Sequence, residues 1–328
     1  MIISRAPVRI SLGGGGTDLS SYYSKFGGFL IAGGINKHIY IAINQRFHKS
    51  IRLSYSVTEI VDSIDRIQHK LFREALRHTK TDNHIELVSI ADVPANCGLG
   101  SSSTFSVALL NGLHVFKRDF INLKELAEEA CHLEIDICKE PIGKQDQYMA
   151  AFGGLTCLTF DKDGSVLVEP LAISNDKIIQ LENNILLFYT GIERSASDIL
   201  KVQSQKTEQN EDNTLKLLHK IKEIGLETRK AFERGDLNRF GELLDVHWNT
   251  KKKLSNKISD PHLDECYEFA LKNGALGGKI MGAGGGGFFM FFCPNNPGHL
   301  IEVLEQKMNL TYMHFRFDFE GAKIVSNL

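Results

Sequence analysis

The segment of residues 94–103, PANCGLGSSS, combines residue types that suit an anion. Its glycines let the backbone approach a ligand closely, and it precedes a run, up to residue 116, with helical spacing. Free N–H groups and the helix dipole make such a position a phosphate site. The alternative is an ordinary helix start, for which one Ser or Gly suffices. Five Gly or Ser residues occupy the six positions 98–103, which is more than a cap needs.

Two other glycine-rich segments are weaker matches to nucleotide-binding patterns. Residues 282–287, GAGGGG, fit the GxGxxG pattern, but the strand-like FFMFF follows where a dinucleotide fold requires a helix. The segment NGALGGKI is similar to a Walker A loop, yet Asn273 and Ile280 stand where that loop has Gly and Ser or Thr. Both interpretations are therefore rejected.

The bulk composition bounds the class of protein. The chain has 328 residues, 24% of them charged, with a formal net charge of −2 at pH 7. This balance argues against a nucleic-acid partner, so any anion site is local. The six cysteines show no zinc-ligand spacing, and neither a signal-peptide core nor a membrane-length apolar run is present. We expect a cytoplasmic protein that acts on small molecules without membrane contact, and its oligomeric state cannot be read.

The elements that must position these residues alternate between strands and helices. Strand-like runs dominate the first part of the chain, and long helical runs dominate after residues 175–185. Residues 122–140 predict one helix with Asn122 and Glu125 as a capping box. The turn DKDG predicts a hairpin, and the alternating segment 313–319, MHFRFDF, predicts a closing strand. The content is α+β.

Four segments resemble, in order along the chain, the motifs of the GHMP kinase family, which includes galactokinases and mevalonate kinases. They are PVRISLGGGGTD (7–18), PANCGLGSSS (94–103), GKQDQ (143–147) and KIMGAGGGGF (279–288). The resemblance implies a two-domain GHMP kinase fold. An ATP-binding N-terminal domain, similar to ribosomal protein S5 domain 2, would span residues 1–180. A ferredoxin-like C-terminal domain would span 181–328, with the active site between the two.

The same resemblance implies an ATP- and Mg²⁺-dependent phosphotransferase and assigns its phosphate loop. The residues that match the ATP-binding motif are Pro94, Gly98, Leu99, Gly100, Ser101, Ser102 and Ser103. Ser102 and Glu134 match the family's serine and glutamate at the metal, and hard oxygen ligands suit Mg²⁺. The alternative for Glu134 is a carboxylate on a solvated helix face.

Asp146 matches the family's catalytic aspartate, which would orient the acceptor hydroxyl and take its proton. Arg9 matches an arginine that lies near this aspartate in galactokinases, where a cation keeps the carboxylate ionised. The simpler alternatives are a helix cap for Asp146 and a surface arginine for Arg9. Whether Asp146 removes the proton or only orients the hydroxyl cannot be read from the sequence.

Departures from the galactokinase pattern narrow the choice of the acceptor sugar. Gly15 and Gly16 stand where galactokinases carry a glutamate and a histidine, so galactose is disfavoured. The segments LGGGGTD, GKQDQYMAAFGG and YTGIERSASDIL are most similar to the branch of the family that phosphorylates O1 of D-glycero-D-manno-heptose 7-phosphate. The residues expected at the acceptor are Gly15, Gly16, Thr17, Asp18, Lys144, Arg194, Gly284 and Gly285, with Lys144 and Arg194 as candidates for a distal phosphate.

Two alternatives remain open at this point. One is a kinase for an unphosphorylated sugar, similar to fucokinases. The other is a non-catalytic sensor of sugar and ATP, which Asp146, Arg9 and Glu134 argue against.

Overall fold

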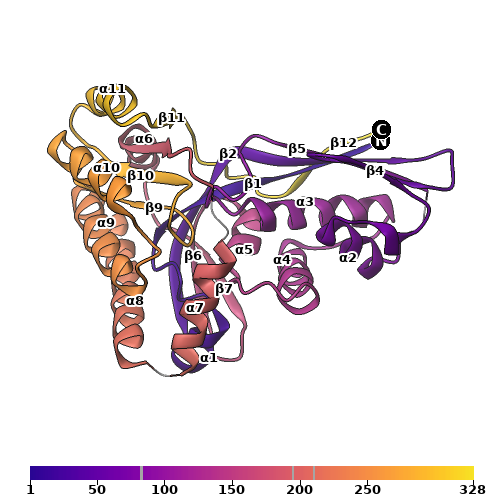
Figure 1. The fold of residues 1–328 in the computed structure, drawn as a ribbon, viewed down its shortest axis with the longest axis horizontal. Coiled ribbons are helices and arrows are strands. Elements are labelled where there is room, and N and C mark those ends of the chain that lie inside the picture. The colour runs from indigo at the N-terminus through magenta and orange to yellow at the C-terminus, as the bar shows by residue number, and fades with distance from the viewer. Residues whose placement is uncertain (82–83, 194–195, 210) are drawn as a thin grey trace.

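A computed structural model describes residues 1–81, 84–193, 196–209 and 211–328. Two β-sheets organise the chain, with helices packed against each (Figure 1). The first is eight-stranded, with the order β12-β1-β2-β5-β3-β4 and with β6 and β7 continuing beside β2. The second is four-stranded, with the order β11-β8-β10-β9.

The first sheet is built on β1 (Ile2–Gly13) and β2 (Gly28–Gln45), which pair antiparallel along most of their length. The first part of β2 pairs with β6 and its last part with β5, so one long strand joins two parts of the sheet. The remaining strands are β3 (Ile51–Ser54), β4 (Thr58–Val61), β5 (Ile85–Ala91), β6 (Leu155–Phe160), β7 (Val166–Pro170) and β12 (Lys323–Asn327). Strands β6 and β7 form the hairpin predicted around DKDG.

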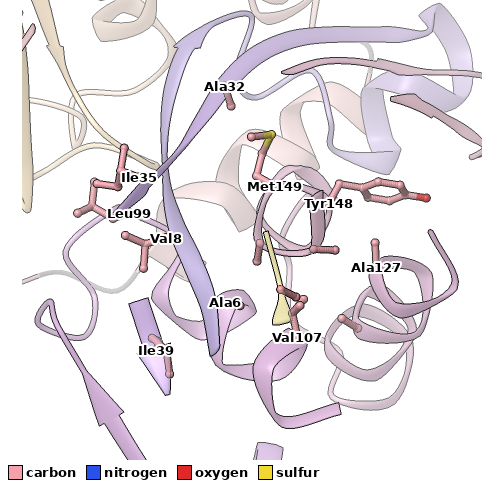
Figure 2. Packing of buried hydrophobic residues seen from close by; sticks show 14 of the residues in the cluster. Ala6, Val8, Ala32, Ile35, Ile39, Leu99, Val107, Ala127, Tyr148 and Met149 are labelled. Atoms are coloured by element: carbon pink, nitrogen blue, oxygen red, sulfur yellow. The ribbon is translucent and has the colours of Figure 1, made fainter. Parts of the chain in front are cut away.

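Helices cover one face of this sheet. The central one is α3 (Ser101–Phe116), which packs against β1 and β2 and buries ten of its sixteen residues. One buried cluster contains Val107 of α3, Ala6 and Val8 of β1, Tyr148 and Met149, and the Tyr148 ring points toward Ala127 (Figure 2). The neighbouring helices are α1 (Ser20–Phe26), α2 (Lys70–His78), α4 (Leu123–Cys131) and α5 (Gln145–Phe152).

The second sheet has its own apolar core around Trp248. Strand β10 (Phe288–Phe292) reads FFMFF and is buried at every position, as expected for a strand covered on both faces. Its partners are β8 (Ile185–Tyr189), β9 (Gly277–Ile280) and β11 (Thr311–Met313). The helices of this part are α6 (Asn175–Asn184), α7 (Ala196–Glu208), α8 (Asp212–Glu233), α9 (Leu237–Lys251), α10 (Pro261–Lys272) and α11 (Pro297–Met308). A strand follows the glycines of 282–287, which agrees with the rejection of a dinucleotide fold.

The chain passes from the first sheet to the second between α6 and β8, close to the boundary expected after residue 180. The C-terminal strand β12 then returns to pair with β1, so residues 323–327 lie in the first sheet. The two chain ends lie side by side, and the N-terminal ammonium donates to the carbonyl of Leu328 at 2.7 Å (Figure 1).

The predicted closing strand at 313–319 is wrong beyond Met313, where β11 ends. Phe317 makes only an isolated bridge with Ile35, although Phe315 and Phe317 are both buried. The alternation therefore reflects side-chain burial without a continuous ladder. The expected capping box is present, since Asn122 and Glu125 each accept a hydrogen bond from the other's backbone N–H. No helix in the described ranges is long and apolar enough to span a bilayer.

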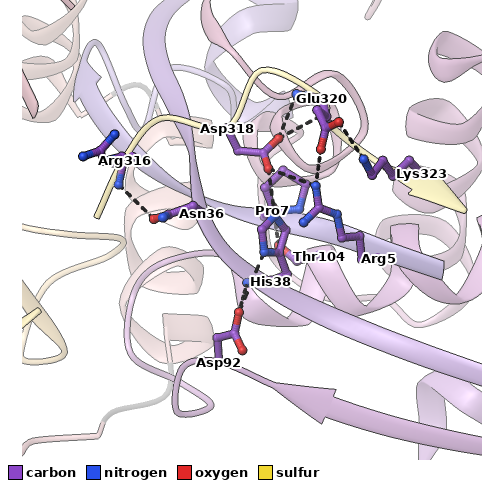
Figure 3. Close-up of polar contacts among 11 residues, drawn as sticks. Arg5, Pro7, Asn36, His38, Asp92, Thr104, Arg316, Asp318, Glu320 and Lys323 are labelled. Atoms are coloured by element: carbon purple, nitrogen blue, oxygen red, sulfur yellow. Dashed lines mark hydrogen bonds and ion pairs between the residues drawn. The ribbon is translucent and has the colours of Figure 1, made fainter. Parts of the chain in front are cut away.

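A polar cluster fastens the C-terminal segment to the sheet (Figure 3). Buried Asp318 lies 2.8 Å from Nε2 of His38 and accepts hydrogen bonds from the N–H groups of Glu320 and Gly321. Burial alone raises the pKa of Asp318, but these hydrogen bonds and the charge of His38 outweigh it and hold the pKa below 3.8.

We predict that Asp318→Ala lowers the free energy of unfolding at pH 7 by roughly 2–4 kcal/mol, because His38 and two N–H groups lose a buried partner. Since the folded-state pKa is depressed, this stabilisation is present above pH 3.8 and is lost as the pH falls below it. Urea unfolding of parent and variant at pH 7 and pH 3 measures both effects. Glu320→Ala, at a side chain 54% exposed, is the control and leaves stability close to the parental value. Equal losses at both pH values would contradict the assignment.

Candidate active site

A cavity of about 330 Å³ lies between the part of the chain that forms the first sheet and the part that forms the second. Arg9 of β1, Ser102 of α3 and Asp146 of α5 line it from the first part, and Lys251 and Lys279 line it from the second. Arg9, Ser102 and Asp146 belong to three of the four segments that resemble family motifs, so these three segments meet at the cavity. The fourth segment, 279–288, supplies the opposite wall.

The Arg9 guanidinium and the Asp146 carboxylate form a close pair inside this cavity. Oδ1 of Asp146 lies 2.8 Å from Nε and 2.6 Å from Nη2 of Arg9. Nη1 of Arg9 donates to the carbonyl of Gly98 at 2.7 Å. The Arg9 side chain is only 5% exposed, so it is not a surface arginine, and Asp146 retains 25% exposure toward the cavity. Asp146 therefore presents an oriented carboxylate and does not serve as a helix cap.

The start of α3 is built for a ligand rather than for its own capping. Gly100 is the N-cap in the left-handed region, with φ of 79°, and no side chain caps the helix. A Cβ on Gly100 would lie 3.0 Å from Oδ2 of Asp146, so glycine also leaves room for that carboxylate. Ser101, Ser102 and Ser103 line the cavity at this uncapped N-terminus, where an anion is favoured.

The other residues of the expected phosphate loop take supporting positions. Gly98 lines the cavity, whereas the described lining contains neither Pro94, which is exposed, nor Leu99, which is buried. The carbonyl of Leu99 accepts the Arg9 N–H at 3.0 Å, so Leu99 fixes the loop to β1. Asn96, which the sequence analysis did not single out, also lines the cavity.

Glu134 is fully buried behind the serines and is not on a solvated face. Ser102 Oγ donates to its Oε1 at 2.9 Å, and Gln147 Nε2 donates to its Oε2 at 2.7 Å. Burial raises the pKa of Glu134 to about 7, although the hydrogen bonds from Ser103, Gln147 and Ser102 act in the opposite direction.

The local backbone turns Glu134 inward. The single helix expected over 122–140 instead changes at His132 into a π-helical segment, His132–Ile137, a deviation that is frequent at functional sites. Asp136, two residues further on, points outward and pairs with exposed His132. A buried carboxylate beside serine hydroxyls is a donor set that fits Mg²⁺, with phosphates and water completing the shell.

At the opposite end of the cavity, Asp18 is held by backbone donors. Its Oδ1 accepts the Gly16 N–H at 3.0 Å, and its Oδ2 accepts the Gln145 N–H at 3.2 Å. Burial and the nearby charge of Asp146 raise the pKa of Asp18. Gly15 and Gly16 line the cavity beside it. Thr17 is fully buried, and its hydroxyl donates to the carbonyls of Gly14 and Phe29, so it braces the turn behind the cavity.

Two residues that the sequence analysis missed lie at this end. Ser11 Oγ and Gln145 Nε2 are buried, line the cavity and have no hydrogen-bond partner among the described residues. Buried polar atoms are normally satisfied, so a hydroxyl-bearing ligand is the natural partner for both. Ser11 stood inside the PVRISLGGGGTD segment and Gln145 inside GKQDQ, so each lay within a recognised motif.

Of the remaining residues expected at the acceptor, some line the cavity and others do not. Lys144 points away from the cavity, since its ammonium donates to the carbonyl of Gly164 at 2.6 Å and lies 5.5 Å from the Tyr23 ring centre. Gly284 lines the cavity, whereas the Gly285 N–H is used by the carbonyl of Ile258. Arg194 lies outside the described residues.

The opposite wall carries basic residues that the sequence analysis did not select. Lys251 and His247 of α9 and Lys279 of β9 line the cavity. The run KKK at 251–253 resembles a solvated helix face in the sequence, and only the fold separates Lys251 from its exposed neighbour Lys253.

Comparisons with known proteins agree with this arrangement. The family model for the GHMP kinase N-terminal domain matches residues 64–154, and that for the GHMP kinase C-terminal domain matches residues 228–309. The chain is 30% identical to the D-glycero-alpha-D-manno-heptose 7-phosphate kinase of Campylobacter jejuni, over 98% of each chain. It is 26% identical to the L-fucokinase/L-fucose-1-P guanylyltransferase of Bacteroides fragilis, over 92% of this chain but 35% of that one.

Solved structures give the same result. A D-glycero-D-manno-heptose 1-phosphate kinase from Bacteroides thetaiotaomicron superposes with a TM-score of 0.83 at 26% identity, covering 100% of both chains. A galactokinase of Lactococcus lactis, at 18% identity and a TM-score of 0.77, shares the fold. The full-length similarity and the two matched domains show that this chain belongs to the GHMP kinase family and is a sugar kinase of that family.

Proposed function

We propose that the protein transfers the γ-phosphoryl group of ATP to O1 of D-glycero-D-manno-heptose 7-phosphate and uses Mg²⁺ to do so. The observation that carries this proposal is the full-length similarity to the Campylobacter jejuni heptose 7-phosphate kinase. The cavity supports it, because the Arg9–Asp146 pair stands between an uncapped helix N-terminus and unpaired polar atoms that suit sugar hydroxyls.

In this proposal the phosphates of ATP lie over the start of α3, where the backbone of 98–103 and the helix dipole bind negative charge. Ser102 and Glu134 would hold Mg²⁺, which would supply positive charge next to the phosphoryl oxygens. Asp146 accepts a hydrogen bond from the acceptor hydroxyl and takes its proton during transfer. Arg9 holds the Asp146 carboxylate in a fixed orientation before transfer, because its Nε and Nη2 both contact Oδ1.

The position of the acceptor's own phosphate is a separate question. The Campylobacter relative is named for a heptose 7-phosphate, whereas the Bacteroides thetaiotaomicron structure is titled a heptose 1-phosphate kinase. An ADP-release screen with heptose 7-phosphate, heptose 1-phosphate, the free heptose and L-fucose distinguishes these acceptors. ³¹P NMR of the product then identifies the new phosphate ester. Turnover of L-fucose alone would favour the fucokinase alternative, which rests on the similarity to the Bacteroides fragilis protein.

We predict that Asp146→Asn lowers kcat by about 100-fold or more and leaves the Kd for ATP unchanged. The change keeps the size of the side chain but removes the proton acceptor, and positioned acid–base groups contribute 10²–10⁴-fold. Single-turnover rates and nucleotide titrations measure the two quantities. Asp136→Asn, at a side chain 63% exposed and outside the cavity, is the matched control. Near-parental turnover by Asp146→Asn would rule out the assigned role.

We predict two effects of Glu134→Gln. The Mg²⁺ concentration needed for half-maximal activity rises about tenfold or more, because a metal ligand is replaced. In addition, the metal-free parent loses stability as the pH rises from 4.5 to about 7, since its folded state binds the Glu134 proton more tightly than the unfolded state. This loss amounts to at most about 3 kcal/mol, and the variant lacks it.

Mg²⁺ titrations of activity and urea unfolding across that pH range, with Asp136→Asn as control, test both effects of Glu134→Gln. Overlapping Mg²⁺ curves for parent and Glu134→Gln would limit Glu134 to a structural role.

A further inference from the structure

Three basic side chains form one wall of the cavity and have no place in the mechanism above. His247 and Lys251 are four residues apart on α9, which puts them on one face of the helix, and Lys279 lies on the adjacent strand β9. Nζ of Lys279 lies 3.3 Å from Nδ1 of His247, and Lys251 donates to the carbonyl of Gly282. Lys279 is 3% exposed and His247 1%. We refer to His247, Lys251 and Lys279 as the basic wall.

Within the described part of the chain, no carboxylate pairs with either lysine of the basic wall. The acidic groups of the cavity have other partners. Asp146 is paired with Arg9, and Glu140 is paired with Lys70. Glu134 accepts from Ser102 and Gln147, and Asp18 accepts from two backbone N–H groups. Burying an ammonium group without an anion is costly, so this arrangement is unfavourable for stability on its own.

The electrostatics of the wall agree with that view. Burial, together with the charge of Arg9, lowers the pKa of Lys251 to about 8. Burial and the charges of Lys251 and Arg9 lower the pKa of Lys279 strongly. His247 has a pKa well below 6.5, first through burial and then through the two lysines, so it stays neutral beside Lys279. An anion between the two ammonium groups would reverse these shifts.

We propose that Lys251 and Lys279, positioned by His247, bind the phosphate group that the acceptor already carries. Each ammonium group offers three N–H donors. The two ammonium groups can therefore both donate charge-assisted hydrogen bonds to the oxygens of one phosphate. This assignment rests on the proposed function and identifies the residues that select a phosphorylated sugar. It places the acceptor's phosphate on the second part of the chain, away from Lys144.

The arrangement of the cavity favours the acceptor over ATP as the source of this phosphate. The ATP phosphates have their own donors at the start of α3, together with Ser102 and Glu134. The basic wall comes from α9 and β9 in the second part of the chain, whereas Ser102 and Glu134 belong to the first. The sugar hydroxyls are expected near Asp18, Gly15 and Ser11. Apart from the basic wall, the described lining of the cavity contains one lysine or arginine, Arg9, and it is engaged by Asp146 and Gly98.

The first experiment needs no knowledge of the sugar and uses inorganic phosphate as probe. Phosphate raises the unfolding temperature of the nucleotide-free parent and has a much smaller effect on Lys251→Gln and Lys279→Met. Without phosphate, Lys279→Met unfolds at or above the parental temperature, because it removes a buried, unpaired charge. Lys253→Gln, two residues away and exposed, behaves as the parent in both conditions. A parental response to phosphate in both lysine variants would overturn the proposal.

The second experiment separates the acceptor from ATP. Lys251→Gln and Lys279→Met should raise the KM for heptose 7-phosphate about 10- to 100-fold, and they should leave the KM for ATP and the KM for the free heptose near parental values. An increase in the KM for ATP with both acceptors would assign the wall to the nucleotide and overturn the proposal, as would unchanged constants throughout.

Failure of the proposed function has a different signature. The parent would then turn over no heptose phosphate, so the acceptor assignment would fall with it. The response of the parent and the lysine variants to inorganic phosphate would still decide whether the basic wall is an anion site.

Discussion

The ion pair between Arg9 and Asp146 is the contact on which the arrangement of the site depends. Arg9 comes from β1 and Asp146 from α5, and the same guanidinium bonds the carbonyl of Gly98 in the phosphate loop. One buried side chain thus fixes the Asp146 carboxylate relative to the glycine-rich loop before α3. Because Arg9 is only 5% exposed, loss of either partner would leave an uncompensated charge in the interior, and that cost holds the geometry in place.

The rest of the cavity carries charges that the protein alone does not neutralise. On one side the pKa of Glu134 is raised to about 7 by burial, and on the other the pKa of Lys251 is lowered to about 8. Each shift records a cost to the folded protein that a ligand of opposite charge would remove. The proposed Mg²⁺ beside Glu134 and the proposed phosphate beside Lys251 would supply these opposite charges.

The sequence allowed the fold class and the central pair to be predicted, because Arg9 and Asp146 stand in motifs of fixed local spacing. It did not allow Lys144 to be placed, since neighbouring positions at a helix start point in different directions, and Lys144 turns to Gly164. Lys251 was missed because nothing in the run KKK distinguishes this half-buried lysine of the cavity wall from the exposed Lys253. The π-helical turn at Glu134 and the return of β12 to β1 depend on tertiary contacts that no local pattern encodes.

A close backbone contact joins the two parts of the chain beside the cavity. A Cβ on Gly98 would lie 2.7 Å from the carbonyl of Met281, and one on Gly282 would lie 2.8 Å from Cα of Gly98. The phosphate loop and the loop after β9 therefore touch through glycines alone, and Lys251 holds that second loop through the carbonyl of Gly282. Any side chain at this point would push the basic wall away from the phosphate loop. In-line transfer requires both substrates within bonding reach. In the proposed mechanism, the contact between Gly98 and Gly282 would hold the two walls of the cavity together.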